Sequence, residues 1–90
     1  LANAQLGMTY LAQNRLDLAE KYLKEARRLD ASHFSLPQLH LAEVHFRRQN
    51  WLGAAAELEE LLRLHPGIDT DGKIHAEIDK LKKLGSTEKK

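Results

Sequence analysis

The chain has 90 residues, of which 42% are hydrophobic and 30% charged, so it is sufficient for one small globular domain and is not expected to be disordered. Its net charge is +1, and basic and acidic residues balance along the chain, so no segment has the one-signed field that nucleic-acid binding needs. Without cysteine it has neither a disulfide framework nor a cysteine-based zinc site, and no apolar run approaches the roughly 18 residues of a membrane span. We therefore expect neither nucleic-acid binding nor membrane insertion.

Two helices are expected in the first third of the chain, at about residues 2–13 and 17–29. The second places its apolar residues at the i, i+3, i+4 and i+7 spacing of a helix that buries one face. Asn14 and Arg15 separate the two helices, and Asn tolerates the left-handed conformation that a tight turn needs. The outer face of the second helix predicts two ion pairs, Asp17 with Lys21 and Glu20 with Lys24.

A third helix is expected at about residues 36–48. Ser35 is a good N-cap residue, and Gln38 completes a capping box with it. Pro37 falls in the first turn, where its missing N–H costs nothing. These three residues together predict where the helix begins.

Two more helices are expected before the chain ends. Asn50 is expected to cap one at about 52–64, and His65-Pro66-Gly67 ends it. A further segment starts near Asp71 and forms a helix at about 72–84, with one apolar face and a charged remainder, which is typical of a helix that caps a stack. Residues 85–90 are expected to be a disordered tail. The apolar face of the last helix is formed by Ile74, Ile78, Leu81 and Leu84.

The sequence repeats itself when it is shifted by 35 residues. The matches fall mainly on small and apolar positions, which indicates a shared packing scheme. The alternative is a generic bundle with accidental self-similarity. The matching pairs are Leu1/Leu36, Leu6/Leu41, Gly7/Ala42, Leu11/Phe46, Leu16/Trp51, Ala19/Ala54, Leu23/Leu58, Ala26/Leu61, Arg28/Arg63 and Leu29/Leu64.

These repeated residues resemble the tetratricopeptide repeat (TPR) family. The family pattern appears in the first unit as Leu6-Gly7-x-x-Tyr10, Ala19, Leu23 and Ala26, and in the second as Leu41-Ala42, Ala54, Leu58 and Pro66. The departures from the pattern are His45 in place of Tyr, Leu61 in place of Ala, Ala31 in place of Pro, and one extra residue near Phe34.

The resemblance implies an all-α fold, a right-handed superhelix of antiparallel helical hairpins. It implies a single TPR-like domain over residues 1–84. Repeat 1 would span about 1–34, repeat 2 about 35–68, and a capping helix about 71–84. Gly7, Ala42, Ala19 and Ala54 are then small because paired helices cross closely there, and Leu23 and Leu58 fill the space between neighbours.

No residue set predicts catalysis, a cofactor or a metal, so we expect a protein that is not an enzyme. His40 and His45 are five apart and do not share a helix face, and the other histidines do not form a ligand motif. We interpret His45 as a packed side chain bonded to the backbone through one nitrogen. The acidic run Glu57, Glu59 and Glu60 is interpreted as a solvated helix face. Trp51 is interpreted as a core residue, with an exposed binding residue as the alternative.

The resemblance places a bound peptide or partner segment on the concave side, which is lined by the first helix of each hairpin. There Met8 and Phe46 are adaptable apolar anchors, and Arg47 has the geometry to clamp a carboxylate. The Lys and Asn residues with which some family members grip a C-terminal carboxylate are missing, so an apolar or mixed ligand is expected. The expected partner-binding residues are Ala4, Met8, Leu11, Leu39, His40, Glu43, Phe46 and Arg47.

Two other expectations compete with peptide binding. The chain could be a purely structural C-terminal segment of a longer array, or it could self-associate through the open N-terminal edge. The chain opens at Leu1 in the middle of the repeat pattern and without Met, so we expect a mature protein or an excised fragment, with any targeting signal upstream.

Overall fold

Five α-helices make up most of the residues that the structure, a computed structural model, describes; these are residues 3–30 and 36–88, and they include no strand. The described part of the protein is therefore all-α, as the sequence predicts. The first four helices begin and end within one residue of their expected bounds. The helices are α1 (Asn3–Ala12), α2 (Leu16–Leu29), α3 (Pro37–Arg47), α4 (Trp51–Leu64) and α5 (Lys73–Glu88).

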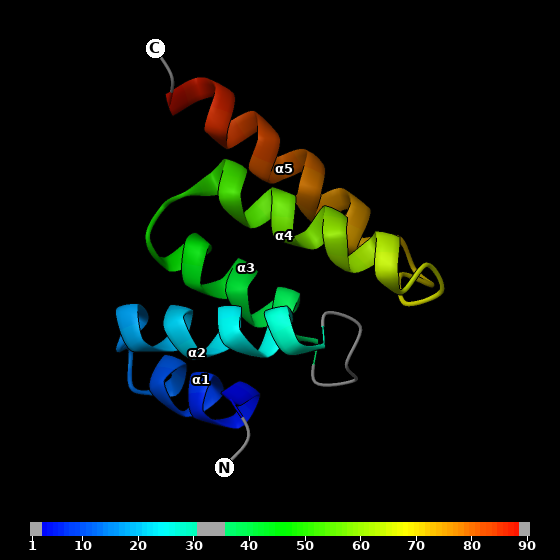
Figure 1. The fold of residues 1–90 in the computed structure, drawn as a ribbon. Coiled ribbons are helices and arrows are strands. Elements are labelled where there is room, and N and C mark those ends of the chain that lie inside the picture. The colour runs from blue at the N-terminus through cyan, green and yellow to red at the C-terminus, as the bar shows by residue number, and fades with distance from the viewer. Residues whose placement is uncertain (1–2, 31–35, 89–90) are drawn as a thin grey trace.

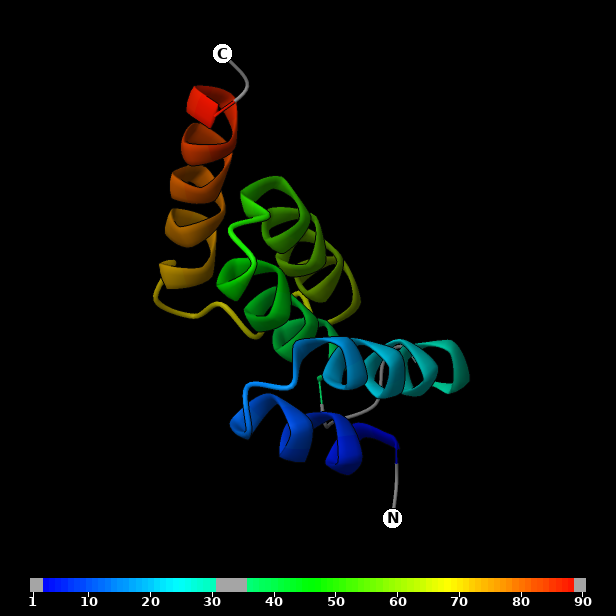
Figure 2. The same cartoon turned by 90° about the vertical axis from the view of Figure 1, so that its left-hand side faces the viewer.

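The helices are stacked in chain order, with the two termini at opposite ends of the molecule (Figure 1). Each helix packs on the next one along the chain, and α1 also packs on α3, which joins the first hairpin to the second. In the view of Figure 2, α1, α3 and α5 lie toward one side, and α2 and α4 toward the other. The odd-numbered helices therefore share a side of the molecule.

A residue with a left-handed backbone conformation lies in each of the two tight turns between paired helices. Asn14 has φ 58°, as expected from the sequence, and Gln49 takes the equivalent conformation with φ 60° before α4. Asn50 then caps α4, because its Oδ1 accepts a hydrogen bond of 3.1 Å from the N–H of Gly53. A Cβ at Gly53 would lie 2.5 Å from the Asn50 amide nitrogen, so glycine leaves the space that the capping side chain occupies.

The N-terminus of α3 differs from the expected one by a residue. The cap position falls on Leu36, which has a left-handed φ of 54°, and Pro37 is the first helical residue. Ser35, the expected cap, lies outside the described residues, and so does its expected pairing with Gln38. The Gln38 side chain is fully buried, and its Nε2 donates a 3.1 Å hydrogen bond to Glu60 on α4. Gln38 therefore helps to join α3 to α4.

The last helix is longer than expected, so the prediction of a disordered tail is wrong for residues 85–88. The sequence suggested a stop at Gly85, but Gly85 is buried in α5, where a Cβ would lie 2.5 Å from the Leu52 side chain. Glycine here permits close packing on α4 and does not end the helix. Leu84, expected on the apolar face, is 36% exposed. Residues 89 and 90 lie outside the described part.

Two apolar clusters hold the stack together. One joins the first hairpin to α3, and the other joins α3, α4 and α5. Leu23 is fully buried in the first cluster, and Leu58 is 6% exposed in the second, as expected. Ile78 and Leu81 of α5 complete the second cluster, which is the packing expected of a capping helix. The buried members are Leu11, Ala19, Leu23, Leu41 and Val44 in the first cluster, and Ala42, Ala54, Ala55, Leu58, Leu61, Ile78 and Leu81 in the second.

Candidate functional site

An open hollow of about 580 Å³ lies between α1 and α3. Its walls combine apolar side chains with a few polar ones, which is the composition of many binding sites. Six of the eight residues predicted for the partner surface line it. The lining residues are Met8, Leu11, Ala12, Leu39, His40, Glu43 and Arg47.

A second open hollow, of about 290 Å³, lies between α3 and α5. Its floor is formed by small or buried apolar residues, and it contains Phe46, a seventh predicted residue. The lining residues are Leu39, Ala42, Glu43, Phe46, Ala54, Leu58, Lys73, Ile74, Glu77 and Leu81. Leu39 and Glu43 line both hollows, so the two adjoin, and together we call them the groove.

The groove exposes large apolar side chains to solvent. Met8 is 41% exposed, Leu39 is 40% exposed and Phe46 is 44% exposed. The Phe46 ring packs edge-on against the half-buried Trp51, with the ring centroids 5.3 Å apart, which holds Phe46 in place. Trp51 also packs against the second apolar cluster, in agreement with the core interpretation. Apolar groups clustered on a surface in this way are typical of an interaction site.

Hydrogen bonds within the protein hold the Arg47 side chain in place. Its Nε donates to Glu43 at 2.9 Å, and one of its terminal nitrogens donates to the carbonyl of Leu11 at 2.8 Å. The same nitrogen lies 3.4 Å from the side-chain oxygen of Asn14. Arg47 therefore links α3 to the C-terminal end of α1, and much of the donor capacity expected to clamp a carboxylate is already used.

His40 is half-buried where α1 faces α3. Burial lowers the pKa of its imidazole below the ordinary value of 6.5, and the nearby Glu43 carboxylate only partly opposes this. The neutral ring is therefore favoured at neutral pH. His40 then adds hydrogen-bonding capacity to the groove without adding a positive charge.

Ala4 is the one predicted residue that the structure keeps away from both hollows. It is 6% exposed, so its side chain offers a partner almost no surface. Conversely, Lys73, Ile74 and Glu77 of α5 line the second hollow although they were not among the predicted site residues. Ile74 was recognised only as a capping residue, and the position of α5 beside α3 depends on packing that periodicity alone does not give.

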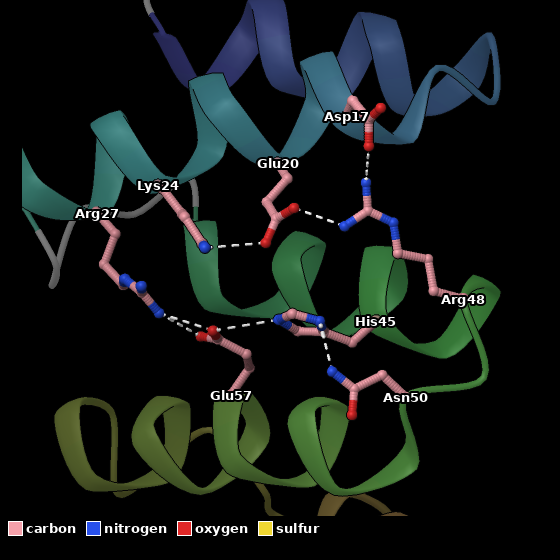
Figure 3. A network of polar contacts seen from close by, with 8 residues as sticks. All are labelled: Asp17, Glu20, Lys24, Arg27, His45, Arg48, Asn50 and Glu57. Carbon is pink, nitrogen blue, oxygen red and sulfur yellow. Dashed lines mark hydrogen bonds and ion pairs between the residues drawn. The ribbon is translucent and has the colours of Figure 1, made fainter.

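A polar network crosses the opposite side of α3 and joins α2, α3 and α4 (Figure 3). The Arg27 guanidinium of α2 donates to both carboxylate oxygens of Glu57 on α4, at 2.7 Å each. Glu57 is only 8% exposed, so its assignment to a solvated face is wrong. The burial arises because Glu57 faces the junction of three helices, where Arg27 compensates its charge.

His45 lies in the same network. It is largely buried, as predicted, but its ring nitrogens face side chains and not the backbone. Its Nδ1 lies 3.3 Å from the Asn50 amide nitrogen, and its Nε2 lies 3.7 Å from Glu57. Because the Asn50 oxygen is occupied in capping α4, the amide nitrogen faces His45 as a donor. The predicted backbone bond of His45 is thus replaced by a contact with the cap.

The predicted ion pairs of α2 are half right. Glu20 and Lys24 pair at 2.9 Å, but Asp17 pairs with Arg48 at the end of α3 and not with Lys21. Arg48 also donates to Glu20, and the hydrogen bonds from Lys24 and Arg48 hold the pKa of Glu20 below its ordinary value. Arg48 therefore adds a further link between the two hairpins (Figure 3).

Within residues 3–30 and 36–88, no group of three or more His, Cys, Asp or Glu side chains is placed to hold a metal ion. No helix among these residues is both long enough and apolar enough to cross a membrane. Comparison of the chain with protein-family models, with curated proteins and with solved structures gave no match.

Proposed function

We propose that the protein is a non-catalytic interaction module of the TPR type that binds a peptide or partner segment in the groove. The observation that carries this proposal is the convergence of the predicted stripe. Seven of the eight residues that the TPR resemblance implies on α1 and α3 line one continuous open surface, and its large side chains are apolar and exposed. A surface of this composition gains free energy when a partner covers it.

The helix order supports the TPR part of the proposal. Two helical hairpins follow one another with a 35-residue repeat, close packing at small residues and a capping helix. In such a stack the first helix of each hairpin lines one side, which is where the groove lies. The groove is therefore the surface to test first.

The competing functions are a structural segment of a longer array and self-association, both through the open edge of α1. A shallow hollow on α1 makes this edge a defined alternative, and it is lined by Gln5, Met8, Thr9 and Ala12. Met8 and Ala12 belong to both surfaces, so substitutions there do not separate the two functions. Gln5 and Thr9 belong to the edge alone, whereas Leu39 and Phe46 belong to the groove alone.

Selection from a displayed library of random short peptides, followed by amide NMR mapping of the selected peptides, tests the proposal. The proposal expects shifts at Leu39, Glu43 and Phe46. Shifts confined to Gln5 and Thr9, or a concentration-dependent dimer with the same footprint, would favour the open edge. If no selected peptide shifts the amide resonances of the groove residues, the proposal is wrong.

A further inference from the structure

The hollow between α3 and α5 is the smaller of the two that form the groove. Both helices pack on α4, but among the described residues they do not pack on each other, so α4 forms the floor between them. Ala54 on that floor and Ala42 on α3 are small, and this leaves the space of about 290 Å³. A site of this size is at the lower end for small-molecule pockets and suits a single large apolar side chain of a peptide.

Three charged side chains line this hollow, Glu43, Lys73 and Glu77, and together they carry one net negative charge. Glu43 accepts from Arg47 at 2.9 Å, and Lys73 lies 3.8 Å from Asp71. Glu77 differs from them: it is half-buried and lines the hollow, and it makes no ion pair or hydrogen bond with another described residue. The uncompensated charge at this part of the groove is therefore negative.

The nature of the occupant follows from what happens to Glu77 when the hollow is covered. A neutral apolar ligand would remove water from the carboxylate without replacing its hydrogen bonds, which is unfavourable. An acidic ligand would add repulsion. A ligand cation beside the apolar group offsets both effects, and at a partly desolvated site it contributes more than at a fully exposed one.

We infer that the hollow between α3 and α5 receives a large apolar side chain of the partner, together with an adjacent Lys or Arg that pairs with Glu77. The inference rests on the proposed function, since it assigns a ligand chemistry to one half of the same groove. It gives the partner a sequence signature: an apolar anchor with a basic neighbour. Phe46 and Ile74 would contact the anchor from the two walls.

The experiment compares the peptides that the same random library yields against three proteins: wild type, Glu77→Lys and Asp79→Lys. Asp79 is an exposed carboxylate of the same helix that does not line the groove, so its substitution matches the charge change without touching the site. Wild type and Asp79→Lys should both enrich Lys or Arg beside an apolar residue. Glu77→Lys should enrich Asp or Glu at that place.

One enriched basic peptide is then titrated by fluorescence anisotropy. Its affinity should fall by about three- to tenfold for Glu77→Gln, and the difference should shrink as salt is raised. Peptides that move the groove resonances but show no charge bias, with Glu77→Lys unchanged, would overturn this inference and leave the proposed function standing. If no peptide moves those resonances, the proposed function fails, and the inference fails with it.

Discussion

Gly7 lies where α1 crosses α2 closely. A Cβ there would stand 2.5 Å from the Leu23 side chain and 3.2 Å from the Leu23 backbone nitrogen, and Leu23 is fully buried and has no room to move. Gly7→Ala should therefore destabilise the protein by about 1–3 kcal/mol, in spite of the better helix propensity of Ala. Urea melts measure this free energy directly.

Gly85→Ala is the matched control for Gly7→Ala. Its Cβ would also meet a leucine at 2.5 Å, but that residue, Leu52, is 38% exposed and can turn away. We expect Gly85→Ala to be close to neutral. Equal losses at the two glycines would show that the crossing of α1 and α2 is not the tight contact described.

His40 should make the free energy of unfolding of the protein depend on pH in a predictable direction. Its pKa is lower in the folded protein than the ordinary 6.5, so the unfolded chain binds the proton more readily. Stability contributed by His40 is complete above the unfolded pKa and is lost as the pH falls through 6.5 toward the lower folded value. Between about pH 7 and pH 5, His40→Gln should lose less free energy of unfolding than wild type. If the free energy of unfolding of His40→Gln and of wild type changed equally with pH, burial would not lower the pKa of His40 as described.

At the scale of elements, Arg27 and Glu57 hold the two hairpins in register. Removing Arg27 leaves a carboxylate that is 8% exposed with only His45 nearby, so Arg27→Gln should cost about 1–3 kcal/mol. Arg28→Gln is the natural comparison, because Arg28 pairs with Glu25 on the exposed face of the same helix, so its loss should destabilise the protein less than the loss of Arg27. Equal losses in thermal or urea unfolding would exclude a special role for the buried pair.

The helices themselves were predictable because their local signals agree. Apolar spacing, Asn14, Asn50 and Pro66 each marked a helix or its end, and no tertiary contact opposed them. Glu57 was misjudged although a signal existed: the 35-residue shift places it opposite Tyr22, an apolar-face position. Its burial depends on a cation supplied by another helix, and spacing within one helix does not reveal that.

The groove was predictable in part for the same physical reason. The TPR resemblance indicated the side of α1 and α3 to consider, and residues one turn apart on a helix point to one side, so Met8, Leu39 and Glu43 could be grouped together. The contribution of α5 was not predictable, because it depends on how far α5 stands from α3 across α4. The expected charge of the ligand depends on Glu77, and its position beside the hollow follows only from the three-dimensional structure.

At the scale of the whole molecule, α5 covers the second apolar cluster. Deleting residues 69–90 would remove Ile78 and Leu81 and expose Leu58 and Leu61 of α4. We expect the shortened protein to self-associate or lose solubility, as measured by size-exclusion chromatography with light scattering. Deleting only residues 86–90 leaves those contacts in place and should give the same oligomeric state as the full chain. A stable monomer after the longer deletion would show that α5 is not a cap.

If the groove binds the partner, a charge introduced into it should weaken binding, and the same charge introduced elsewhere should not. Leu39 lines both hollows and is 40% exposed, whereas Leu29 is 63% exposed and lies outside the groove, so Leu39→Glu and Leu29→Glu introduce the same change at different places. For a peptide selected on the wild-type protein, the account predicts at least about a tenfold weaker Kd with Leu39→Glu and an unchanged Kd with Leu29→Glu. Equal affinity of both variants and wild type would contradict it.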